Sequence, residues 1–124
     1  MSRRNEIKLS EEEQRELLES ERIVIVSSHG RNGWPHLMPL WYVPRDGEVW
    51  IWTYAKSQKV RNLERDPRAT LLVETGHEYT ELRGVMIEAD AAAALQAQAA
   101  KRVAIRFEPK RVRTWDHRKL GGRY

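Results

Sequence analysis

The last ten residues of the chain, 115–124, bring aromatic, imidazole and cationic side chains together where a chain normally trails off. Trp115 and Tyr124 carry large rings that lose little entropy when they are buried. His117 lies between them, and Lys119 and its arginine neighbours can bind phosphate or carboxylate through charge-assisted hydrogen bonds. This combination predicts that the C-terminal tail, residues 109–124, closes over a planar, anionic ligand.

A second candidate site is the segment 53–61, where a predicted strand runs into a predicted helix. Thr53 and Ser57 supply hydroxyl groups, and the helix start supplies free N–H groups. Lys56 and Lys59 supply ammonium groups, which complete the set that a phosphate requires. A solvated, basic helix start capped by Ser57 is the alternative. Lysines at a helix N-terminus oppose the helix dipole, however, and this favours an external anion.

The segment 35–42 is apolar but contains Pro35 and Pro39, which a central strand would reject. We therefore expect it to run along an edge or a cleft. The apolar residues that are then candidates to lie against a flat ring system are Leu37, Met38, Pro39 and Trp41. Packing in the wall of the fold is an equal alternative for each of them.

The sequence gives little support to catalysis by the protein's own side chains. The absence of cysteine excludes a disulfide, a thiolate nucleophile and a zinc–thiolate site. The four histidines lack metal-ligand spacing, so no metal is expected. Nucleophile-elbow, P-loop and dinucleotide-binding motifs are absent as well. Catalytic residues are therefore unidentified, and the difficult chemistry is expected to belong to a cofactor.

Charge is unevenly distributed along the chain. The net charge is +4, but residues 109–124 hold six Lys or Arg against Asp116 alone, and the other 108 residues carry −1. This favours a discrete anion site and argues against nucleic-acid binding, for which a basic stripe is missing. No stretch is apolar enough to span a membrane, and no signal peptide is recognisable, so we expect a cytoplasmic protein.

The predicted elements are those of one small domain covering residues 1–124. Ser10 and Glu13 form a capping-box pattern, which begins a helix that extends to about Ser20. Apolar, β-branched runs between turn residues predict strands at 22–28, 34–43, 49–54, 68–74, 79–88 and 103–107. Further helices are predicted at 56–65 and 91–100. Six short strands in so small a chain indicate a mainly β fold, a closed or nearly closed antiparallel barrel.

The order of these segments resembles the pyridoxamine 5′-phosphate oxidase-like split β-barrel superfamily. The resemblance is carried by residues 35–42, 53–68, 81–86, 101–103 and 115–124 and covers nearly the whole chain. Within the superfamily the C-terminal segment is similar to the flavin/deazaflavin oxidoreductases of actinobacteria, in which coenzyme F420 replaces FMN. The link 88–101 is shorter than the helical connection usual in that family.

The resemblance implies roles for individual residues. Thr53, Ser57 and Lys59, helped by Lys56, would hold the cofactor phosphate. Leu37 to Pro39 would line the tricyclic ring, and Arg83 would reach the same pocket. The family forms homodimers with cofactor sites at the subunit interface, so the remaining site residues would come from the other subunit: Trp115, His117, Lys119 and Tyr124.

The function implied is an F420-dependent reductase that transfers hydride to an electron-poor double bond of a small organic substrate. An FMN-binding protein similar to pyridoxamine-phosphate oxidase is one alternative. A non-catalytic F420 carrier is another, suggested by the short 88–101 link. The proton donor and the substrate are left open by the sequence.

Overall fold

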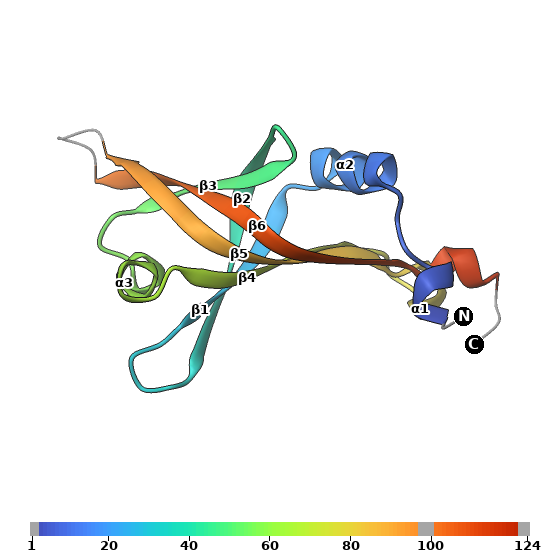
Figure 1. Ribbon diagram of the computed structural model, residues 1–124, viewed down its shortest axis with the longest axis horizontal. Coiled ribbons are helices and arrows are strands. Elements are labelled where there is room, and N and C mark those ends of the chain that lie inside the picture. Colours follow the sequence, from blue (N-terminus) through green and yellow to red (C-terminus); the bar gives the residue numbers. More distant parts are fainter. Residues whose placement is uncertain (1–2, 97–100, 122–124) are drawn as a thin grey trace.

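The computed structural model describes residues 3–96 and 101–121 (Figure 1). Its helices are α1 (Arg3–Glu6), α2 (Glu11–Ser20) and α3 (Gln58–Arg65), with the short 3-10 helices η1 (Tyr79–Glu81) and η2 (His117–Leu120). Its strands are β1 (Ile23–His29), β2 (Pro35–Arg45), β3 (Glu48–Tyr54), β4 (Arg68–Thr75), β5 (Arg83–Gln96) and β6 (Arg102–Asp116). No helix in these ranges is long and apolar enough to cross a membrane.

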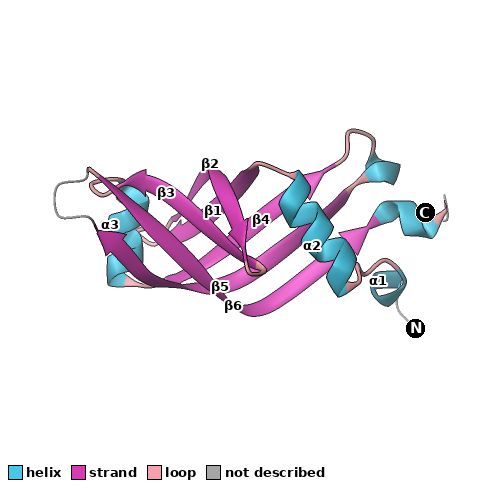
Figure 2. Cartoon of the chain, turned by 90° about the horizontal axis from the view of Figure 1, so that it is seen from above, coloured by secondary structure: helices cyan, strands magenta, loops and turns pink. Residues whose placement is uncertain are grey.

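The six strands form a closed barrel in the order β1-β2-β3-β6-β5-β4, and every neighbouring pair is antiparallel. This confirms the predicted mainly β, six-stranded antiparallel split barrel. β5 and β6 run side by side along the length of the molecule (Figure 2). α3 lies at one end of this pair, and α1 and η2 lie at the other (Figures 1 and 2).

The core follows from strand alternation, because every second side chain points into the barrel. Val49 and Ile51 on β3 and Val103, Ile105 and Phe107 on β6 are all almost fully buried. The predicted helix start is confirmed on α2, where the Ser10 hydroxyl accepts from the Glu13 N–H and the Ser10 N–H donates to Glu13 Oε1. α2 then buries Leu17 and Leu18, as the sequence indicates.

The helix predicted at 91–100 is wrong over Ala91–Gln96, which continue β5. Ala91 pairs with Phe107, Ala92 with Arg106, and Gln96 with Val103. Alanine favours a helix, but a long hairpin with β6 satisfies the backbone and covers the barrel, and this tertiary gain overrides the weak local preference. Residues 97–100 lie outside the described ranges. β5 and β6 are thus joined by residues 97–101 alone.

Two further boundaries differ from the prediction. Residues 79–81 form η1, and β5 begins only at Arg83. β6 extends to Asp116, well past the predicted end at 107. Residues 109–116, which were expected to form part of a cofactor-closing tail, therefore complete a strand paired with β5.

The barrel is split between β2 and β3. Residues 35–41 of β2 pair with β1 only, and residues 42–45 pair with β3. On the facing side, residues 52–54 of β3 pair with β6 only. The first half of β2 therefore has a free edge, which is where Pro39 causes no loss of a ladder hydrogen bond. The prediction that this proline-containing strand follows an edge is confirmed.

Candidate functional site

Thr53 and Lys59 meet where β3 gives way to α3. Alternation along β3 turns Thr53 inward, and the buried face of α3 carries Lys59 towards it. The Lys59 ammonium donates to Thr53 Oγ1 at 2.9 Å. Only 7% of Lys59 and 6% of Thr53 remain exposed. Two of the residues expected to bind phosphate are therefore in direct contact.

Lys59 is a buried cation without a counter-ion. It forms no ion pair with any carboxylate that the structure describes. Burial lowers the pKa of Lys59 below its ordinary value of 10.5, because desolvation penalises the charged form. An anion bound beside the ammonium would relieve this penalty, so the site is electrostatically suited to a phosphate.

Ser57 adds an unused hydroxyl next to this cation. It is the N-cap residue of α3 but makes no side-chain capping hydrogen bond. Its Oγ is buried and has no hydrogen-bond partner among the described groups. The N–H groups of the first turn of a helix also lack partners within the helix. The hydroxyl, the N–H groups and Lys59 form a donor set that fits a phosphate group. Lys56 is exposed just before them.

The segment expected to line a ring is exposed on the free edge of β2. Leu37 is 57% exposed, Met38 is 41% exposed, and Pro39, which follows them, is also exposed. Trp41 lies farther along the strand and is 72% exposed. These positions are therefore not core positions, and the packing alternative does not hold within this chain. Their apolar side chains are available to a ligand or to another protein surface.

Arg83 and the C-terminal candidates lie far from Thr53. Thr53 pairs with Val103 at one end of β6, whereas Arg83 pairs with Asp116 at the other. Val103 and Asp116 are 13 positions apart on β6, a span of up to about 40 Å at roughly 3.3 Å per residue. Trp115 packs at the same far end against Gly84, where a Cβ would lie 2.5 Å from the indole. One chain therefore does not bring both groups together.

The basic C-terminal residues make intramolecular contacts. The Lys119 ammonium donates to Glu13 Oε1 at 2.6 Å and to the Lys8 carbonyl at 2.8 Å. The Arg118 guanidinium pairs with the buried Asp116 carboxylate at 2.7 Å and holds the pKa of Asp116 below its ordinary value. The two Lys119 hydrogen bonds connect η2 to the N-terminal segment. Tyr124 lies outside the described residues.

His117 connects η2 to η1. Its Nδ1 lies 2.9 Å from the Tyr79 carbonyl, and the two rings form an edge-to-face pair with centroids 4.8 Å apart. Among the described residues, no three His, Asp or Glu side chains come together as a metal site.

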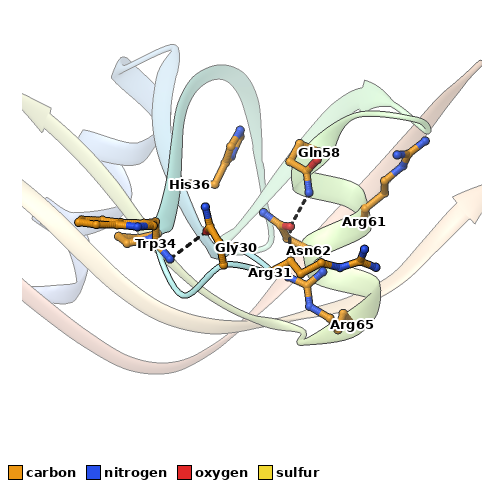
Figure 3. A pocket seen from close by; sticks show the side chains of 10 residues that line it. Gly30, Arg31, Trp34, His36, Gln58, Arg61, Asn62 and Arg65 are labelled. Carbon is orange, nitrogen blue, oxygen red and sulfur yellow. Dashed lines mark hydrogen bonds between the residues drawn. The ribbon is translucent and has the colours of Figure 1, made fainter.

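The sequence analysis missed a cationic cleft beside Lys59 on α3. Arg61 and Arg65 of α3 line it together with Arg31 and His36 of the β1–β2 hairpin (Figure 3). The spacing of Arg61 and Arg65, four residues apart in a predicted helix, was a usable signal. No sequence signal indicated that Arg31 lines the same cleft, because its position depends on how the β1–β2 hairpin folds back.

Comparisons with known proteins agree with this fold. A conserved hypothetical protein from Mycobacterium tuberculosis is 35% identical, with a TM-score of 0.89 over 98% of this chain and 93% of that one. A FAD-binding protein from Mesorhizobium loti is 16% identical, with a TM-score of 0.73 over 86% of this chain and 93% of that one.

A structure named as an F420 reductase is 17% identical, with a TM-score of 0.68 over 78% of this chain and 93% of that one. No curated protein sequence matches the chain significantly. The family model described as pyridoxamine 5′-phosphate oxidase matches residues 10–116. That match takes in the whole barrel, the free edge of β2 and the Thr53–Lys59 pair, so the chain belongs to the pyridoxamine 5′-phosphate oxidase family.

Proposed function

We propose that this chain is a cytoplasmic oxidoreductase that binds coenzyme F420 and reduces an electron-poor double bond of a small organic substrate. The observation that carries the proposal is the buried, counter-ion-free Lys59 ammonium beside the unpartnered Ser57 hydroxyl. A phosphate ester of a redox cofactor satisfies both groups. The family match and the similarity in fold to an F420 reductase support the choice of a flavin-type cofactor.

The chain's own residues bind and orient the cofactor. Lys59, Ser57 and Thr53 hold its phosphate, and the apolar edge from Leu37 to Pro39 lies along its ring and keeps water away. When bound, the cofactor supplies the hydride chemistry.

We further propose a homodimer. The outer faces of β2 and β3 expose Trp41 (72%), Val43 (62%) and Trp52 (53%) around a hollow of about 450 Å³. So large an apolar surface is typical of a protein interface. A partner subunit would bring Trp115, His117, Lys119 and Tyr124 to the Thr53–Lys59 pair, which lies at the opposite end of β6 in the same chain. In such a dimer the Lys119 ammonium would donate both to Glu13 of its own chain and to the cofactor.

The experiment that tests the function is a tryptophan-fluorescence titration with F420 and, separately, with FMN, followed by turnover assays. We expect saturable quenching by F420, weaker binding of FMN, and oxidation of reduced F420 by at least one acceptor in a panel of enoates and quinones. Sedimentation velocity should give a dimer. Failure of both cofactors to bind would contradict the proposal.

Two outcomes would redirect the assignment. Preferential FMN binding would identify the FMN-dependent alternative, which the FAD-binding neighbour makes reasonable. Tight F420 binding without turnover would identify a carrier. The carrier alternative rests on the short β5–β6 connection, which comprises residues 97–101.

The lowered pKa of Lys59 predicts a pH dependence of cofactor affinity. A bound phosphate favours the ammonium, so the complex binds more protons than the free protein once the pH reaches the lowered pKa. Affinity should therefore fall as the pH rises, and the fall should begin below 10.5, the ordinary lysine value. Titrations between about pH 7.5 and 10 leave the charge on the phosphate unchanged, because the phosphodiester of F420 carries one fixed negative charge and the second pKa of a phosphomonoester such as FMN is about 6.

The matched control is Lys59→Gln, which has no titratable group at this position. Its weaker affinity should be flat over the same range. A parallel fall in the variant and the parent chain would assign the pH dependence to another group.

A further inference from the structure

A second cationic cavity lies beside the proposed phosphate site. It has a volume of about 500 Å³ and is enclosed by the β1–β2 hairpin on one side and the exposed face of α3 on the other (Figure 3). The hairpin contributes Arg31 and His36, and the helix contributes Arg61 and Arg65. This volume is within the usual range for small-molecule sites.

The charges in this cavity are all of one sign. The residues that line it include three guanidinium groups, one imidazole and the carboxamides of Gln58 and Asn62, but no carboxylate. Arg61 and Arg65 are four residues apart on α3, an arrangement of like charges that destabilises a helix. A bound anion would offset the repulsion between these two guanidinium groups.

The guanidinium groups of Arg31 and Arg61 are free to bind such an anion. Neither makes a hydrogen bond or an ion pair with the residues that the structure describes. Arg65 differs, because it donates to the His29 carbonyl at 2.7 Å and approaches Asn62 Oδ1 at 3.3 Å. Arg65 therefore ties α3 to the hairpin and fixes the shape of the cavity.

Buried polar contacts hold the cavity floor in place. Asn62 is fully buried, accepts from Gln58 Nε2 at 2.8 Å and donates to Ser28 Oγ on β1 at 3.1 Å. His36 adds a buried Nδ1 that has no hydrogen-bond partner among the described groups. A site whose walls are fixed before binding loses less entropy when a ligand arrives.

The residues that line the cavity are close in sequence to those of the proposed cofactor site. Lys59 and Arg61 lie two residues apart on α3, and His36 directly precedes Leu37, where the ring is expected. The same two elements, β2 and α3, therefore carry both sites, and the cavity can hold an extended part of the cofactor or a second ligand beside it.

We propose that this cavity binds an oligocarboxylate through Arg31 and Arg61. The inference rests on the proposed function for its position beside the ring, but the binding itself requires only the cavity. Two or more carboxylates match paired guanidinium groups, each of which can bind a carboxylate through two hydrogen bonds. The carboxylates come either from the acidic tail of the cofactor or from an acidic substrate.

The test uses three probes on the full chain: F420 with an oligoglutamate tail, the tail-free deazaflavin 5′-phosphate, and tri-γ-glutamate alone. The main variant is the double substitution Arg31→Gln and Arg61→Gln. Both residues are exposed, and neither side chain makes a hydrogen bond or an ion pair with the residues that the structure describes, so the variant should fold. Arg15→Gln is the matched control, because Arg15 is an exposed arginine on α2 outside the cavity.

Two results would support the proposal and separate its sources. A loss of about tenfold or more in affinity for tailed F420, with the tail-free cofactor unaffected, assigns the cavity to the cofactor tail. Unchanged affinity for both cofactors, with salt-sensitive binding of tri-γ-glutamate that only the double variant loses, assigns it to an acidic second ligand.

Equal binding of all three probes by the double variant and the Arg15→Gln control would overturn the proposal, as would absence of tri-γ-glutamate binding together with unchanged affinity for tailed F420. Lys59→Gln distinguishes this failure from failure of the proposed function. That variant should lose affinity for both cofactors and keep tri-γ-glutamate binding. If the parent chain binds neither cofactor, the tri-γ-glutamate titration still decides whether the cavity binds carboxylates.

Discussion

Replacing Lys59 with alanine should weaken F420 binding by roughly 10- to 100-fold, because a charge-assisted hydrogen bond to a phosphate is worth about 1.5–3 kcal/mol. Among the described residues the buried ammonium donates only to Thr53 Oγ1, so its two other N–H groups are available to the ligand. Equilibrium titration by tryptophan fluorescence measures the effect. The loss should be similar for FMN, since both cofactors carry a phosphate ester.

The matched control for this variant is Lys56→Ala. Lys56 is exposed, and its charge is screened by solvent, so we expect a loss of affinity of no more than about threefold. Thermal unfolding should show Lys59→Ala at least as stable as the parent chain, because an uncompensated buried cation opposes folding. Lys59→Met, which retains the buried stem, separates charge from packing. Unchanged cofactor affinity in Lys59→Met would show that the phosphate binds elsewhere.

Phe107→Ala should cost about 3–5 kcal/mol of unfolding free energy, the usual loss when a large core side chain is truncated. Phe107 is only 1% exposed and lies on β6 between Val49 of β3 and Ala91 of β5. A domain of this size has roughly 5–15 kcal/mol in total, so the variant retains little stability. Chemical denaturation gives the free energy, and the melting temperature should fall by about 10 °C or more.

Val112→Ala is the control on the same strand. Val112 is 39% exposed, so its truncation should cost less than about 1 kcal/mol. If Phe107→Ala and Val112→Ala were equally stable, the barrel interior would not lie where the structure places it.

Local sequence patterns were sufficient for much of the fold. The β-branched run 23–26, the Asp46-Gly47 turn and the capping box of Ser10 and Glu13 each specify their element through contacts between close neighbours. The hydroxyls and lysines of 53–59 are likewise a local signal, because a strand that ends in a helix start always brings these groups near one another. The structure confirms the contact of Thr53 with Lys59.

Local patterns failed where distant contacts determine the structure. The alanines from Ala91 onward favour a helix by intrinsic propensity, yet pairing with Phe107 and its neighbours on β6 keeps them extended. The contact of Lys119 with Glu13, 106 residues earlier in the chain, was likewise not indicated by any local pattern. No sequence window contains both partners of such an interaction.

The sequence by itself determined the class of fold, the free edge at Pro39 and the chemical types of the residues proposed to bind phosphate. Only the tertiary structure decided that Lys59 is buried without an ion pair to any described carboxylate, and that Arg83 and Trp115 lie at the far end of β6. It also decided that Arg31 and Arg61 line the same cavity. The physical reason is that burial and counter-ion pairing depend on which elements pack together. That packing is set by the summed contacts of the whole barrel and by no single segment.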